Sequence, residues 1–381
     1  MKPTAMVDDM FWRGRRVMVT GHTGFVGSWL TLWLERLGAV VTGYSDGLPT
    51  SVSMYRLCGL EAHVPWIRGD IRDGMSLTAA LQQAKPEIVF HLAGASASKS
   101  ESETDSEHGN GSSLARLFDV EVVGTAALLD AVRLVSRDCP IRAVVALTSD
   151  DCYAPRPWGA GLRESDPLGG DTPAAASKAC AELAAAAFRQ AYFAGGAGPA
   201  VATVRAGGLI GGGDFGAGRL AADCVRAAAQ GRAAQLPARP DEARPWLHVL
   251  DALAGCLALA QRLFPPGGEA YAEAWNLGPR AGDARTSAWL AETLCAGLGS
   301  PWAAPAGGSA GESEQRRRQA AAPLLDTAKA AERLGWHPRL EASQAVRWAA
   351  EWYAAWMKGL PLREAAAAQI ACYERLSAEQ G

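Results

Sequence analysis

The chain has 381 residues, of which 49% are hydrophobic and 20% are charged. This composition is typical of a globular protein and excludes a largely disordered chain. The 37 basic and 40 acidic side chains leave a formal net charge of -3, which argues against an electrostatic nucleic-acid binder and a polybasic membrane anchor. At roughly 150 residues per domain, the length suits two to three domains or one large domain with a smaller lobe.

No apolar run reaches the roughly 18 residues that a membrane-spanning helix needs, and the first residues lack the apolar core of a signal peptide. The eight cysteines are scattered, and none forms a CxxC pair. We therefore expect reduced thiols in a cytoplasmic protein, with no metal site and no contact with membranes or nucleic acids.

The first half of the chain alternates short apolar runs with segments of helical periodicity. The predicted strands cover 17–20, 40–44, 64–71, 87–92, 141–148 and 200–205. The predicted helices cover 25–37, 76–84, 114–135 and 173–192. Strands this apolar are covered on both faces, which indicates a parallel sheet between two helix layers. Repeated strand–helix units predict an α/β, doubly wound fold of Rossmann type.

A segment rich in Ser, Glu and Gly, 96–113, follows the carboxyl end of a predicted strand. Open parallel sheets bind ligands at this edge, so the segment could be a lid over the site. A disordered surface insertion is an equal alternative. After residue 205 the pattern becomes irregular and glycine-rich, which predicts a smaller, loop-built lobe.

The segment TGHTGFVG connects the first predicted strand to the first long helix. In such a turn one glycine permits the tight bend, one lets the backbone approach a pyrophosphate, and one allows close packing of helix on strand. The helix N-terminus would then offer free N–H groups to phosphate oxygens. The residues expected to bind the dinucleotide here are Gly21, Thr23, Gly24, Phe25, Val26 and Gly27.

An acidic residue, Asp46, lies 19 positions after Gly27, near the end of the second strand. A carboxylate there can accept hydrogen bonds from the adenosine ribose and would repel a 2′-phosphate, which favours NAD over NADP. The loop could instead present Ser45. The end of the third strand, Asp70 and Ile71, is where the adenine edge is expected.

These motifs, together with GDIRD from Gly69 and HLAG at 91–94, resemble the extended short-chain dehydrogenase/reductase superfamily, the NAD-dependent epimerases and dehydratases. More narrowly, the chain resembles the CDP-glucose 4,6-dehydratases along nearly its whole length. The similar stretches begin at Phe11 (FWRGRRVMVTGHTGFVGSWL), Lys85 (KPEIVFHLAG), Thr148 (TSDDCY), Ser177 (SKACAE), Val204 (VRAGGLIGGGDF), Arg244 (RPWLHVL), Trp275 (WNLGPR) and Leu334 (LGWHP).

The resemblance implies the domain organisation. Residues 11–207, with a return segment near 240–278, would form the NAD-binding Rossmann domain. Residues 208–239 and 279–360 would form a smaller C-terminal nucleotide-sugar-binding lobe, and 361–381 a C-terminal tail. A homodimer or higher homo-oligomer, paired through the helices predicted at 114–135 and 173–192, is also implied.

The resemblance also implies the chemistry. Such enzymes oxidise the C4 hydroxyl of the sugar by hydride transfer to NAD, eliminate water across C5 and C6, and return the hydride to C6. The cofactor is additionally expected to contact the end of the fourth strand, at Leu92, Ala93 and Gly94, and the side chain of Lys178.

The family uses a Tyr-x-x-x-Lys pair as the base for the C4 hydroxyl, and this chain keeps only Lys178, because the tyrosine position is Ala174. Positioned acid–base groups contribute about 10²–10⁴-fold, so the ordinary mechanism should be impaired. Glu121 and Gly208 each occupy a position where the family usually has asparagine.

Ser149, Asp150 and Asp151 fall where the family places substrate-contacting residues, although Asp151 replaces the lysine of the CDP-glucose enzymes and the pair resembles the Asp-Glu of the dTDP-glucose dehydratases. Ser149 would bind the C4 hydroxyl, and the two aspartates resemble an elimination acid and base. Two alternatives could replace the missing phenol. The first is Tyr153, if the strand stays extended so that 149, 151 and 153 share a face. The second is one of the two aspartates, since neighbouring carboxylates raise the pKa of one of them.

In the second lobe, Gly208, Arg219, Arg244 and His248 are the candidates for substrate binding, since a guanidinium matches diphosphate oxygens. The arginines could instead form surface salt bridges, and His248 could be a core residue. Three functions remain open at this point: a 4,6-dehydratase with altered acid–base groups, an epimerase or oxidoreductase that bypasses the tyrosine, and a catalytically degenerate binding paralogue.

Overall fold

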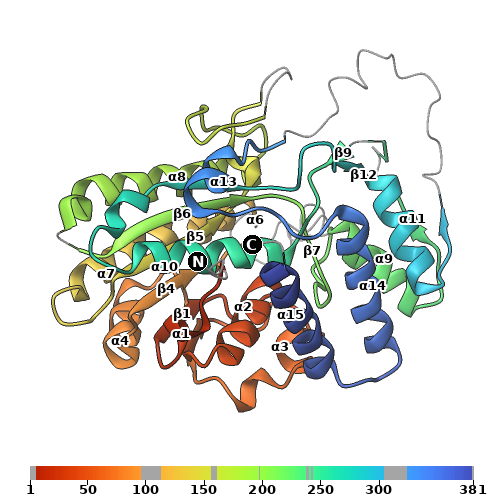
Figure 1. Ribbon diagram of the computed structural model, residues 1–381, viewed down its shortest axis with the longest axis horizontal. Coiled ribbons are helices and arrows are strands. Elements are labelled where there is room, and N and C mark those ends of the chain that lie inside the picture. Colours follow the sequence, from red (N-terminus) through yellow and green to blue (C-terminus); the bar gives the residue numbers. More distant parts are fainter. Residues whose placement is uncertain are drawn as a thin grey trace.

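A seven-stranded parallel sheet lies at the centre of the computed structural model, which describes residues 6–95, 113–155, 161–196, 198–236, 240–241, 243–303 and 324–379 (Figure 1). Its strand order is β11-β6-β5-β4-β1-β2-β3. The strands are β1 (Arg16–Thr20), β2 (Val40–Ser45), β3 (Trp66–Arg68), β4 (Ile88–His91), β5 (Ala143–Thr148), β6 (Ala200–Ala206) and β11 (Ala274–Leu277). The doubly wound α/β prediction is confirmed.

The strands alternate their apolar side chains between two helix layers. In β1, Val17 and Val19 join one core cluster, while Met18 joins the other. One layer contains α2 (Phe25–Arg36) and α10 (Val249–Leu263), and the other contains α4 (Gly74–Ala84), α7 (Gly124–Val135) and α8 (Pro173–Tyr192). Burial on both faces explains why the strands read as continuous apolar runs.

The smaller lobe packs three helices against one another beside this sheet, α9 (Leu220–Ala229), α11 (Ser287–Leu298) and α14 (Ala342–Met357) (Figure 1). Three two-stranded sheets support it: β7 (Leu209–Ile210) with β10 (Leu247–His248), β9 (Ala243–Arg244) with β12 (Arg285–Thr286), and β8 (Ala234–Gln235) with β13 (Trp302–Ala303). The lobe shares one core cluster with the sheet, because buried residues of both belong to it.

Short helices fill the remaining connections. They are α1 (Asp9–Trp12), α3 (Met54–Leu57), α6 (Ser113–Phe118), α13 (Ala328–Leu334) and the 3₁₀ turns Leu60–Ala62, Asp150–Cys152, Ala194–Gly196 and Gly268–Tyr271. Among all the residues that the structure describes, no helix is both long enough and apolar enough to span a membrane.

Three predicted segments differ from the structure. The strand expected at 64–71 is only three residues long. The helix expected at 114–135 contains a π-helical turn, Asp119–Val123, between α6 and α7. The segment 361–381, expected to be a tail, contains α15 (Leu362–Glu379), whose Tyr373 packs edge-on against Trp33 of α2. The possible lid at 96–113 lies almost wholly outside the described residues.

Candidate active site

The glycine turn lies where the strand order reverses, between β1 and β4, which is the ligand-binding position of open α/β sheets. Gly21 has a positive φ of 71°, and a Cβ built on it would come 2.7 Å from the backbone of Leu92 and Ala93. A Cβ on Gly27 would come 2.2 Å from the carbonyl oxygen of Gly21. The turn, the end of β4 and the start of α2 therefore approach one another too closely for side chains at these positions, as in the glycine turn of a dinucleotide site.

The helix that follows the turn begins without a side-chain cap. The N-cap residue of α2 is Gly24, which has no side chain to accept a hydrogen bond from the first N–H groups of the helix. By helix geometry the first N–H groups, those of Phe25, Val26 and Gly27, are directed out of the N-terminus. This is an anion-binding arrangement, and it fits the phosphates of a dinucleotide.

The end of β2 is hydrogen-bonded to this turn, and the residues after β3 are held by contacts of their own. Thr23 donates a 2.7 Å hydrogen bond from its hydroxyl to the carbonyl of Gly47, which brings exposed Asp46 beside the turn. Asp70 forms a bidentate ion pair with Arg72, which holds the pKa of its carboxyl below the usual value. Ile71 is buried against α7, at Gly124. Sequence reasoning missed Arg72.

The end of β4 carries a hydrogen-bonded network. His91 is buried between the hydroxyls of Thr20 and Thr125, at 2.8 and 3.1 Å. Burial, and to a smaller extent the charge of Lys178, lowers the pKa of His91 to about 4. Three residues further on, Gly94 lies beside Lys178, since a Cβ on Gly94 would come 3.3 Å from the lysine Nζ.

Lys178 projects from α8 one helical turn after Ala174. The two positions therefore share a helix face. Ala174 is half-buried, and its carbonyl accepts a 2.8 Å hydrogen bond from the hydroxyl of Ser177. The side chain at this position has no proton to exchange. Lys178 is held instead by Glu121, whose Oε1 lies 2.7 Å from Nζ.

Ser149, Asp150 and Asp151 follow β5, whose last residue is Thr148. The Ser149 hydroxyl donates to Asp150 Oδ1 at 3.2 Å and accepts from the backbone N–H of Asp151 at 3.1 Å. Burial, with a smaller contribution from the charge of Asp151, raises the pKa of Asp150 to about 7. A carboxyl group that titrates near neutrality can act as an acid or as a base.

Tyr153 does not share a face with Ser149 and Asp151, because residues 150–152 form a 3₁₀ turn and the strand does not continue. Its phenol is buried, accepts a 2.8 Å hydrogen bond from Arg205 and donates a 2.6 Å bond to Asn276 Oδ1. Burial raises the pKa of Tyr153 well above its usual value. The hypothesis that Tyr153 replaces the missing base is thus contradicted by its structural role.

The residues expected to bind substrate are spread over the lobe. Gly208, with a positive φ of 42°, packs against Pro245, whose carbonyl oxygen would lie 2.6 Å from an added Cβ. Exposed Arg244 is directly opposite Arg285 in the pairing of β9 with β12, and sequence reasoning missed Arg285. Arg219 is about half exposed and forms a 2.9 Å ion pair with Asp214.

His248 is a core residue, which was one of the two alternatives for it. It is fully buried, caps α10 by accepting the N–H of Leu250, and packs edge-on between Trp29 and Trp348. Burial lowers its pKa to about 3. No surface of this side chain is available to a substrate, so the substrate-binding alternative is wrong.

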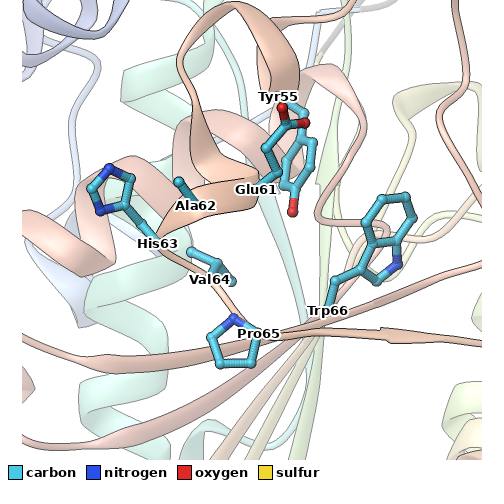
Figure 2. A pocket seen from close by; sticks show the side chains of 7 residues that line it. All are labelled: Tyr55, Glu61, Ala62, His63, Val64, Pro65 and Trp66. Carbon is cyan, nitrogen blue, oxygen red and sulfur yellow. The ribbon is translucent and has the colours of Figure 1, made fainter.

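A cavity of about 370 Å³ lies elsewhere, next to the edge strand β3 (Figure 2). Figure 2 shows Tyr55, Glu61, His63 and Trp66 among the side chains that line it. None of the residues expected to bind cofactor or substrate lines it. Across the described ranges, no group of three His, Cys, Asp or Glu side chains could hold a metal ion.

The comparisons with known proteins agree with this geometry. The model of the NAD dependent epimerase/dehydratase family matches residues 17–278. The chain is 38% identical to the CDP-glucose 4,6-dehydratase of Salmonella typhimurium, over 93% of this chain and 94% of the relative. It is 30% identical to the dTDP-6-deoxy-L-talose 4-dehydrogenase (NAD(P)(+)) of Kitasatospora kifunensis, over 88% and 95% of the two chains.

Solved structures show the same fold. The dTDP-glucose 4,6-dehydratase of Bacillus anthracis, solved in complex with NAD, superimposes with a TM-score of 0.69 at 20% identity, covering 89% of this chain and 96% of its own. The Streptomyces venezuelae dTDP-glucose 4,6-dehydratase gives 0.70 at 23%, covering 91% and 99%. With the glycine cradle, the β4 edge and the family match in agreement, the chain belongs to the NAD-dependent epimerase/dehydratase family.

Proposed function

We propose that the protein is an NAD-dependent nucleotide-sugar 4,6-dehydratase, a lyase that acts on CDP-glucose or a closely related sugar nucleotide. The observation that carries this proposal is the cluster of Ser149, Asp150 and Asp151 directly after β5. The Ser149 hydroxyl donates to Asp150 Oδ1 at 3.2 Å and accepts from the backbone N–H of Asp151 at 3.1 Å. The identity of 38% with a CDP-glucose 4,6-dehydratase, over nearly the whole of both chains, supports the choice of substrate.

NAD fits the cradle formed by Gly21, Gly24 and Gly27, and when bound it supplies a hydride acceptor for the sugar carbon that is oxidised. Lys178 would hold the nicotinamide ribose through its ammonium group. Asp46 would accept hydrogen bonds from the adenosine ribose.

The chain's own acid–base groups would perform the elimination. Ser149 would orient the sugar through its C4 hydroxyl. As the hydride leaves C4, the hydroxyl proton would pass to the carboxylate of exposed Asp151 and from there to solvent. Protonated Asp150 would donate its proton to the C6 hydroxyl as water leaves. Asp151, which is exposed, would take the proton from C5 as a carboxylate. Arg244 and Arg219 would bind the diphosphate in the lobe.

Ala174 favours a second candidate, a catalytically degenerate protein that binds NAD and a sugar nucleotide without converting it. A single experiment separates the two. Purified protein is incubated with NAD and CDP-glucose, and the 4-keto product is followed by its absorbance at alkaline pH. Product supports the dehydratase. Tight binding of both ligands without product supports the degenerate protein, and conversion to an epimer would instead indicate an epimerase that bypasses the tyrosine.

We also propose a homodimer formed through α6, α7 and α8. Large apolar side chains on these helices are exposed, among them Leu134 of α7 at 55% and Leu183 of α8 at 57%. Sedimentation should give a dimer, and Leu183→Glu should give a monomer. All eight cysteines are free thiols, which supports the proposal of a cytoplasmic location.

A further inference from the structure

The ammonium group of Lys178 has an acidic partner that the sequence pattern alone does not assign. Glu121 Oε1 lies 2.7 Å from Lys178 Nζ and also accepts a 2.8 Å hydrogen bond from the backbone N–H of Ala95. The glutamate side chain is only 6% exposed, and the lysine side chain is 24% exposed. A Cβ on Gly94 would come 2.9 Å from Glu121 Oε1, so the pair lies at the end of β4.

The local backbone holds this glutamate in place. Glu121 is in the centre of the π-helical turn Asp119–Val123, and such turns occur frequently at functional sites. The hydroxyl of Thr125 donates a 2.5 Å hydrogen bond to the Glu121 carbonyl and is itself bonded to His91. The backbone of Glu121 is therefore held by Thr125 and its carboxylate by Lys178 and the N–H of Ala95.

The pair is electrically neutral at the end of β4. The carboxylate of Glu121 cancels the charge of the Lys178 ammonium. Burial keeps neighbouring His91 neutral at physiological pH, since its pKa is lowered to about 4. Together these three side chains have a net charge of zero. An uncompensated lysine in the same place would carry one positive charge.

We propose that Glu121 is a positioning residue that neutralises Lys178, so that the site accepts the cationic nicotinamide ring of oxidised NAD without electrostatic repulsion. The inference rests on the proposed function, which puts the nicotinamide ribose at Lys178. The ring is positively charged in NAD⁺ and uncharged in NADH. A nearby unit charge therefore acts on the two redox states differently.

The test is a comparison of NAD⁺ and NADH dissociation constants, measured by calorimetry and by NADH fluorescence on stripped protein. In Glu121→Gln the ratio Kd(NAD⁺)/Kd(NADH) should rise roughly tenfold, the effect of one charge in a partly buried site. In Lys178→Met it should fall, because an unpaired carboxylate remains. The double variant should return to the wild-type ratio. Glu121→Asp, which keeps the charge, should stay near it.

Glu87→Gln is the matched control. Glu87 is a largely buried, ion-paired glutamate immediately before β4, at the opposite end of the same strand. Its removal should leave the ratio unchanged. A ratio that is constant in all variants, or that moves the same way in both single variants, would overturn the inference. Absence of any coenzyme binding by the wild-type protein would instead overturn the proposed function. If Glu121→Gln does not fold, the direction found for Lys178→Met decides.

Discussion

The carboxyl group of Asp150 lies directly against the backbone of Gly207, where the ends of β5 and β6 meet. A Cβ built on Gly207 would come 1.8 Å from Asp150 Oδ2. Only glycine leaves room for the carboxyl group in this position. The carboxyl group proposed as the elimination acid thus occupies the space that a side chain at position 207 would fill.

Gly207→Ala should displace Asp150 without unfolding the protein. We expect kcat for CDP-glucose dehydration to fall by roughly 10²-fold, the contribution of a positioned acid, with little change in KM. Steady-state kinetics checks this, with circular dichroism to show that the fold is kept. Gly74→Ala is the control, because a Cβ at Gly74 meets nothing within 4 Å. Equal effects of the two substitutions would show that Gly207 has no special role.

The pH profile of kcat should depend on Asp150. Because the pKa of this carboxyl is raised to about 7, the group remains protonated, and able to donate, up to neutral pH. The rate should therefore fall as pH rises through about 7. In Asp150→Asn, kcat should be low at every pH and this descending limb should disappear. A limb that persists unchanged in the variant would assign it to another group.

Restoring a phenol at position 174 tests the proposed defect. Ala174→Tyr places a hydroxyl one helical turn from Lys178, and dehydratase activity should rise by roughly 10²-fold or more. Ala368→Tyr, at an exposed position of α15 outside the proposed dimer contact, is the control and should have no effect. Activity that does not rise in a folded, NAD-binding Ala174→Tyr protein would contradict our interpretation of the missing tyrosine.

The buried carboxyl of Asp251 makes the free energy of unfolding depend on pH. This fully buried carboxyl accepts hydrogen bonds from the N–H of Arg339, the N–H of Leu340 and the hydroxyl of Tyr373. Burial raises its pKa to about 6, so folding favours the protonated form. Its contribution to the free energy of unfolding is full below about pH 4 and is lost as pH rises to about 6.

Denaturant titrations of wild type and Asp251→Asn should therefore differ in their pH dependence between about pH 4 and 6. Only the wild type has a side chain at position 251 that titrates there. Asp251→Ala should cost about 3 kcal/mol or more, because three donors lose their acceptor. Tyr373→Phe should cost about 1 kcal/mol. Identical pH profiles for wild type and Asp251→Asn would show that Asp251 does not titrate in this range.

The sequence predicted the sheet and the glycine turn after β1 because both depend on local patterns. Apolar strands, alternating helices and the spacing of Gly21, Gly24 and Gly27 are visible along the chain. A Cβ at Gly27 would clash with the carbonyl oxygen of Gly21, which agrees with the close packing of helix on strand expected at this glycine. Asp46 also lies where its spacing from the turn placed it.

The acid–base residues could be predicted only in part, because their environments are made by distant segments. The 3₁₀ turn after Thr148 redirects Asp151 and Tyr153, and strand periodicity could not show where the strand ends. The burial of His248 arises from tryptophans on α2 and α14. The pairing of Arg244 with Arg285 needs two strands about 40 residues apart, and the partner of Lys178 depends on a π-helical turn.

The fate of CDP-glucose in deuterated water tests the proposed dehydratase most directly. Mass spectrometry of the product formed by the NAD-loaded protein should show the loss of one water, with one solvent deuterium at C5 and the original C4 hydrogen retained at C6. This pattern follows from removal of the C5 proton and internal return of the hydride. Unchanged CDP-glucose, recovered from a protein that binds both it and NAD, would contradict the account.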